Sequence, residues 1–124
     1  MARHTTGIVI NGRDVWVEWS ESAAAELARR SRPLVVELEL YFSCLVKKFV
    51  RFHEDAGGRQ TVAASEKLLF YFRPVTSTGC SFELAERLGR QPETELSGEA
   101  VRRIAPKSVN LDFAGGAWRG SYRL

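Results

Sequence analysis

The sequence predicts an α+β fold, in which three hairpins form a mainly antiparallel sheet of about six strands and three short helices accompany it, in the order ββ-α-ββ-α-α-ββ. Two observations predict this class. Apolar and polar residues alternate over long stretches, which is the period of a half-buried strand. Short turn-forming segments separate these stretches in pairs. With 124 residues, the chain has the size of one domain, residues 1–124.

Composition and charge are ordinary for a globular protein. The chain is 44% hydrophobic and 27% charged, and no apolar stretch approaches the ~20 residues of a membrane span. The N-terminus lacks the apolar region of a signal peptide, so we expect a cytoplasmic protein with no membrane partner. Two cysteines argue against a disulfide framework. A net charge of +3 slightly favours anionic partners without implying nucleic acid.

Residues 7–19 predict the first hairpin. Asn11 and Gly12 tolerate the positive φ angles of a two-residue type I′ turn. Around that turn, Ile8 shares a face with Val15, and this face is apolar on both strands. We therefore expect one face of this hairpin to be buried.

Residues 20–32 predict a helix. Ser20 or Ser22 can cap its first turn, and a run of three alanines follows that favours helix. Arginines gather at its end, where the helix dipole favours cations. Pro33 then stops the helix.

The longest alternating stretch, residues 34–52, predicts one long strand around which the domain is organised. Its even positions are apolar and predict the core face, whereas odd positions such as Glu37 and Glu39 are expected to face water. Lys48 breaks this rule because it is charged at an even position.

A second alternating stretch at about 60–73 predicts the antiparallel partner of that strand. A three-residue turn at 56–58 keeps even positions opposite even positions, and this register places Lys48 opposite Glu66. The two residues then form a buried polar pair, which costs desolvation and could mark a ligand site, a polar network or a subunit contact. Alternatively, they lie where the hairpin overhangs the core and water reaches them.

The remainder of the chain predicts two short helices and a last hairpin. The helices are expected at 81–88 and about 98–105. The hairpin turns at Gly115–Gly116, so that Phe113 faces Trp118. These three features complete the expected element order.

The outer face of the predicted long hairpin is a candidate binding surface, because basic residues alternate there with tyrosine. Single-stranded nucleic acid binds such surfaces through stacking and phosphate contacts. The end of this strand, KKFVRF, resembles the end of the RNP1 motif of RNA-recognition motifs, although it lacks the glycines of that motif. Glu37 and Glu39 on the same face oppose this function. The candidate ligand-binding residues here are Lys47, Arg51, Lys67, Tyr71 and Arg73.

The Ser- and Thr-rich segment before the predicted helix at 81–88 is a second candidate. A helix N-terminus attracts anions and lowers the pKa of a thiol, so Cys80 is a candidate reactive cysteine. Alternatively, Cys80 is a small residue that fills space near a helix cap. The anion-binding candidates in this segment are Arg73, Thr76, Ser77, Thr78 and Ser81.

Cys44 is most simply a small core residue, with a ligand role as its alternative. The four soft ligands, Cys44, Cys80, His4 and His53, show no metal-binding spacing, so we predict no metal site and no cofactor. The segment from Ser20 to Leu27 followed by Ser43–Cys44 resembles A-type iron–sulfur carrier proteins over less than half of the chain. The C-terminal Cys-x-Cys of those carriers is absent here, which puts that function in doubt.

The leading functional hypothesis is a small binding or interaction module. It would recognise an anionic ligand or nucleic acid through the basic sheet face, and it could form a homo-oligomer. The alternative is a thiol-dependent enzyme or a redox or metal-carrier protein that uses Cys80, with Cys44 the weaker candidate. No G-x-S-x-G motif is present, and an enzyme is the lesser hypothesis.

Overall fold

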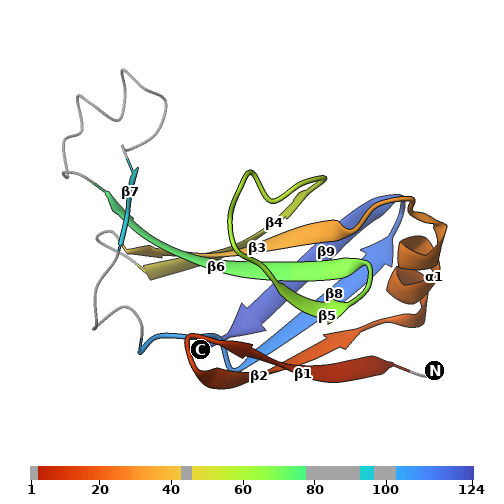
Figure 1. The fold of residues 1–124 in the computed structure, drawn as a ribbon, viewed down its shortest axis with the longest axis horizontal. Helices are drawn as coiled ribbons and strands as arrows, with labels where there is room; N and C mark the ends of the chain where they lie inside the picture. Colours follow the sequence, from red (N-terminus) through yellow and green to blue (C-terminus); the bar gives the residue numbers. More distant parts are fainter. Residues whose placement is uncertain (1–2, 43–45, 78–92, 97–102) are drawn as a thin grey trace.

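The computed structural model describes residues 3–42, 46–77, 93–96 and 103–124, which form two packed β-sheets and one helix (Figure 1). Sheet A has the strand order β1 (His4–Ile10), β2 (Arg13–Trp19), β8 (Ser108–Ala114) and β9 (Ala117–Arg123). Sheet B has the order β4 (Val46–His53), β3 (Leu34–Phe42), β6 (Leu68–Ser77) and β5 (Val62–Ser65), and the short β7 (Glu93–Glu95) pairs with β6. The helix α1 spans Glu21–Arg29.

The predicted fold class is wrong. In the described part of the chain, nine strands form a four-stranded and a five-stranded sheet and one helix is present, in place of one six-stranded sheet with three helices. The expected helix at 81–88 lies outside the described residues. Of the expected helix at 98–105, residues 103–105 are described, and they are turn and irregular chain. The protein is therefore mostly β.

Both sheets follow the same plan, in which two hairpins are joined through a parallel pair of inner strands. In sheet A, β2 pairs with β8 in parallel, with Trp16 beside Ser108. In sheet B, β3 pairs with β6 in parallel, with Leu34 beside Leu68. The sheets are rich in antiparallel pairs, as predicted, but the prediction of a single sheet is wrong because these parallel pairs join residues far apart in sequence, and no turn signal reports them.

The two hairpins with glycine turns are confirmed. Asn11 and Gly12 have φ angles of 52° and 73°, as a type I′ turn requires, and they set Ile8 opposite Val15. In the C-terminal hairpin, Phe113 lies opposite Trp118, with ring centroids 5.0 Å apart. Local turn chemistry was sufficient to fix both registers.

The first predicted helix is also confirmed. The Ser20 side chain accepts a hydrogen bond from the Ala23 amide at 3.2 Å and caps α1. Ala23 and Leu27 face the core. The helix ends at Arg29, before Pro33.

The predicted long strand at 34–52 is two strands, β3 and β4. They form an antiparallel hairpin in which Phe42 lies opposite Val46. The predicted antiparallel partner of this stretch, at 60–73, instead contains β6, which runs parallel to β3. Every pairing in the predicted register is therefore wrong, although even positions of β3 still face the core.

The core lies between the two sheets and is closed at both sides. At one side β4 contacts β9, and at the other β1 contacts β5. The buried Tyr122 hydroxyl on β9 donates a hydrogen bond to the Glu39 carbonyl on β3, which joins the sheets. The core residues with the least exposure are Val15, Val17, Ala23, Val36, Leu38, Leu68, Phe70, Val109 and Leu111. Among the described residues, no helix is long and apolar enough to cross a membrane.

Candidate functional site

Two glutamates are buried on the face of sheet B that points away from sheet A. Glu37 and Glu39 are 6% and 1% exposed, so the expectation that they face water is wrong. The reason is their place on β3, an inner strand with β4 on one side and β6 on the other. Long side chains from both neighbours cover the two carboxylates. Buried carboxylates need compensating partners, and this face supplies them.

Glu39 is held by two arginines from opposite sides. Arg51 on β4 donates to its Oε2 at 2.9 Å, and Arg73 on β6 donates to its Oε1 at 2.8 Å. The side chain of Glu39 is 2% exposed, whereas those of Arg51 and Arg73 are 46% and 22% exposed. The carboxylate therefore exchanges water for two charge-assisted hydrogen bonds, and both guanidinium groups still reach solvent.

Glu37 is held by a tyrosine and a histidine. The Tyr71 hydroxyl donates to Glu37 Oε1 at 2.6 Å, and His53 Nε2 lies 3.1 Å from the same oxygen. Burial alone would raise the pKa of Glu37, but these hydrogen bonds and the Arg73 charge outweigh it and lower the pKa. Burial, followed by the bond to Glu37, raises the pKa of Tyr71. At neutral pH this pair is a carboxylate bound by a neutral phenol.

A second layer of side chains covers Tyr71. The Arg59 guanidinium lies 5.2 Å from the Tyr71 ring centroid, and His53 stacks on the same ring at 6.3 Å. Arg59 donates to Glu95 Oε1 at 2.5 Å, which raises the pKa of Arg59. The segment between β4 and β5, which carries Arg59, arches over sheet B (Figure 1). The middle of this face is therefore a closed, charge-compensated network, which disfavours anion binding there.

The first half of β4 differs from this network because its side chains are open to solvent. All four residues from Val46 to Phe49 are exposed, and they include two large apolar side chains, Val46 at 58% and Phe49 at 37%. β4 is an edge strand, and its second half contacts β9. Figure 1 shows that the end of sheet B where β4 begins extends beyond sheet A. The first half of β4 is therefore an exposed edge that carries both apolar and basic side chains.

The predicted pair of Lys48 and Glu66 is wrong. Lys48 lies opposite Leu40 on β3, and its ammonium donates to the Tyr122 carbonyl at 3.0 Å. Glu66 lies in the turn between β5 and β6, beside the helix. The pair depended on an antiparallel register that the parallel β3–β6 pairing replaces. Lys48 is exposed, in agreement with the alternative that water reaches it.

The structure brings together some of the other predicted residues. Lys47, Arg51, Tyr71 and Arg73 lie on the outer face of sheet B. Lys67 does not, because its ammonium donates to the Ala28 carbonyl at 3.2 Å and to the Arg30 carbonyl at the end of α1. Thr76 donates to the Phe42 carbonyl at 2.8 Å. The candidates Cys44, Thr78, Cys80 and Ser81, and the side chain of Ser77, lie outside the described residues.

Sequence reasoning missed most of the network. It treated Glu37 and Glu39 as solvated, considered His53 only as a possible metal ligand, and gave no role to Arg59 or Glu95. One signal was present, because the two glutamates interrupt a strand that is otherwise apolar. Charged residues at alternate positions of such a strand indicate either a wet face or a paired cluster, and the sequence alone does not separate the two.

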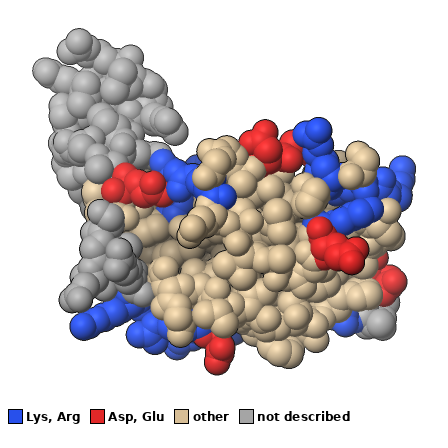
Figure 2. Space-filling view, viewed as in Figure 1, with Lys and Arg blue, Asp and Glu red and all other residues tan. Residues whose placement is uncertain are grey.

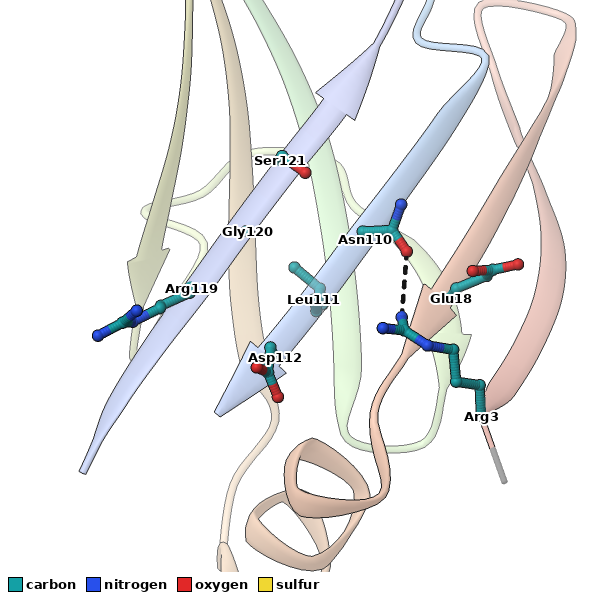
Figure 3. Close-up of a pocket in the computed structure, with 8 residues that line it drawn as sticks. All are labelled: Arg3, Glu18, Asn110, Leu111, Asp112, Arg119, Gly120 and Ser121. Carbon is teal, nitrogen blue, oxygen red and sulfur yellow. Dashed lines mark hydrogen bonds between the residues drawn. The ribbon is translucent and has the colours of Figure 1, made fainter. Parts of the chain in front are cut away.

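A shallow hollow of about 540 Å³ lies on the outer face of sheet A, between β2, β8 and β9 (Figure 3). Asp112 accepts hydrogen bonds there from the Ser20 and Ser22 hydroxyls at 2.5 and 3.1 Å, and these bonds lower its pKa. Asp112 therefore fixes the start of α1. Arg119, its cross-strand partner, points away from it (Figure 3). The lining contains two cations and two carboxylates and has no excess charge.

The comparisons with known proteins add no assignment. No protein-family model, curated protein or solved structure matches this chain. In the described ranges, no three His, Cys, Asp or Glu side chains group as metal ligands.

Proposed function

We propose that the protein is a binding module that captures an extended acidic polypeptide segment along the exposed first half of β4. The observation that carries this proposal is the exposure of Val46, Lys47, Lys48 and Phe49 on an edge strand that extends beyond the other sheet. An exposed edge with apolar side chains is uncommon in a monomeric domain unless a partner uses it.

Charge supports an acidic partner. Lys47 forms no ion pair within the described residues, and the Lys48 ammonium donates to a neutral carbonyl. Neither lysine is therefore neutralised by a carboxylate in that part of the chain. The nearby carboxylates of Glu37 and Glu39 are buried and held by Arg51, Tyr71 and Arg73. Among the described residues, the two exposed lysines therefore carry positive charge that no carboxylate offsets, which favours an acidic segment.

The edge position supports an extended partner. An added strand gains main-chain hydrogen bonds from an edge, and the exposed side chains of that edge supply specificity. Phe49, with the Arg51 guanidinium 5.1 Å from its ring centroid, offers an apolar contact beside the lysines. Two copies of β4 paired together would bring lysines close to lysines, which is unfavourable. This edge is therefore better suited to a different chain than to a second copy, and homo-oligomerisation stays a prediction without support.

The test is a comparison of two double variants with equal charge. Lys47→Glu with Lys48→Glu changes the proposed edge, and Arg32→Glu with Arg119→Glu changes exposed cations elsewhere. Binding of a fluorescent Glu-rich ten-residue peptide is measured by anisotropy as salt is increased. We expect the β4 variant to bind at least about tenfold more weakly than wild type, since two charge contacts are reversed. We expect the control to stay within about threefold of wild type.

Two outcomes would contradict this proposal. Equal losses in both variants would mean that net charge, and not the β4 edge, attracts the peptide. The second outcome uses a labelled single-stranded oligonucleotide of the same charge. If it binds wild type more tightly than the peptide does, and the β4 variant loses this binding, the partner would be reassigned to nucleic acid. The thiol-dependent alternative stays a prediction, because Cys80 and Cys44 lie outside the described residues.

A further inference from the structure

A second basic region lies at the end of sheet A that carries the β1–β2 turn. It is a hollow of about 590 Å³ between the β1–β2 turn, the start of β2 and the chain that enters β8. Figure 2 shows lysine and arginine side chains gathered at the lower left, where Figure 1 places this turn. We propose that this hollow binds a small organic phosphate monoester. The inference does not depend on the function proposed for β4.

The charge of the hollow is one-sided. Arg13, Arg103 and Lys107 line it, and Asp14 is the one acidic side chain in its lining. All three cations are exposed, and within the described ranges none of them forms an ion pair. This differs from the outer face of sheet B, where buried carboxylates hold the arginines. Three cations that form no ion pair with a described residue, around one concave surface, favour an anion of more than one charge.

The backbone around the hollow is fixed by hydrogen bonds. The Asn11 side-chain amide donates to the Ile104 carbonyl at 2.8 Å and ties the β1–β2 turn to the chain before β8. The Trp16 amide donates to the Lys107 carbonyl at 3.0 Å, and the Lys107 amide donates to the Arg123 carbonyl at 2.7 Å. The three cations therefore project from anchored backbone, which lowers the entropy cost of binding.

The floor of the hollow is apolar, and this favours a phosphate ligand that carries an organic group. Ile104 and Ala105 are half-buried, Pro106 is buried and Leu124 is 45% exposed, and all four line the hollow. A volume of about 590 Å³ is within the range of small-molecule sites and larger than a bare phosphate needs. Arginine matches phosphate oxygens in bidentate geometry, and the apolar floor accommodates a ring or short chain.

The test uses the full chain with two probes, inorganic phosphate and phenyl phosphate, followed by amide chemical shifts in NMR titrations. We expect saturable shifts at Gly12 and Lys107 for both probes, with phenyl phosphate at least about threefold tighter because its ring covers apolar surface. Arg13→Gln with Arg103→Gln should weaken both probes by about tenfold or more. Asp14→Asn should tighten the binding of both probes, because it removes the one acidic side chain of the lining.

The control is Arg32→Gln with Arg119→Gln, which removes the same charge elsewhere and should leave both affinities within about twofold. Equal weakening in the control and the Arg13/Arg103 variant would overturn the site, as would shifts that do not saturate. Inorganic phosphate binding as tightly as phenyl phosphate would overturn the organic part of the assignment. Lys47→Glu with Lys48→Glu should leave phosphate binding intact even if peptide binding fails, so the two proposals fail separately.

Discussion

Gly120 lies on β9, at the side of the molecule where β9 of sheet A contacts β4 of sheet B, and its substitution by alanine tests that packing. It is opposite Leu111 in the C-terminal hairpin, and its missing side chain points toward β4. An added Cβ would lie 2.8 Å from Val50 Cγ1, 2.9 Å from Leu111 Cδ2 and 3.3 Å from Phe52 Cζ. Glycine is required here by the space available and not by its backbone angles.

The size of the effect follows from these distances. Ordinary carbon–carbon contacts begin near 3.5 Å, so the Val50 and Leu111 methyl groups must each retreat by roughly 0.6–0.7 Å. Leu111 is 1% exposed and has little room to move. Overpacking of this kind costs about 1–3 kcal/mol. For a domain of this size that corresponds to a fall in Tm of about 4–12 °C.

The assay is unfolding in urea and by heat for Gly120→Ala beside Gly7→Ala. Gly7 is also in a strand of sheet A, but a Cβ there would meet no atom within 4 Å. We expect Gly7→Ala to keep or slightly raise the stability, by up to about 1 kcal/mol. In a Val50→Ala background, Gly120→Ala should cost less, because one colliding methyl group is gone. Equal stabilities of the Gly120 and Gly7 variants would refute the reasoning.

Two further predictions concern the polar groups of β3. Tyr122→Phe removes the hydroxyl that donates to the Glu39 carbonyl, and we expect a loss of about 1–2 kcal/mol in unfolding free energy; an unchanged urea midpoint would contradict it. The pKa of Glu37 is lowered in the fold, so its stabilisation is complete above its ordinary value of 4.5 and is lost as the pH falls through the lower folded pKa. Glu37→Gln should therefore flatten the acid side of the stability profile, measured by unfolding at several pH values, and an unchanged slope would argue against this assignment.

The sequence predicted the elements whose signals are local. The type I′ turn at Asn11, the Ser20 cap and the glycine turn at Gly115 each depend on a few neighbouring residues, and each is present in the structure. The same turns fix which residues oppose each other, so Phe113 and Trp118 were paired correctly. Short-range chemistry was sufficient wherever the partner strand followed at once.

The long strand was misread for a specific physical reason. Three residues, 43–45, separate the paired ends Phe42 and Val46 in sequence, and an odd number keeps the alternation in phase from one strand to the next. These residues include no Gly, Pro, Asn or Asp to mark a break. Two strands therefore have the pattern of one.

The predicted faces of β3 are correct although the predicted register is wrong, because even positions can pair with even positions in either a parallel or an antiparallel arrangement. Leu34 pairs with Leu68 in the parallel arrangement, so even positions still lie beside even positions, as in the predicted antiparallel one. Partners, unlike faces, depend on direction, and so the pair of Lys48 and Glu66 failed. The cluster around Glu39 was missed for the same reason, because its two arginines come from strands on opposite sides of β3 and their pairing depends on strand order.

The parallel pairs at the centre of each sheet have a consequence for how the chain folds. Trp16 pairs with Ser108 across 92 positions, whereas Leu34 pairs with Leu68 across 34. Closing the longer loop costs about 0.9 kcal/mol more chain entropy, a small difference at equilibrium. The effect on the folding rate is larger, because contacts between residues far apart in sequence form slowly. Sheet B can pair within one continuous stretch of chain, whereas sheet A joins two distant hairpins, and the slowest step of folding is expected where β2 meets β8.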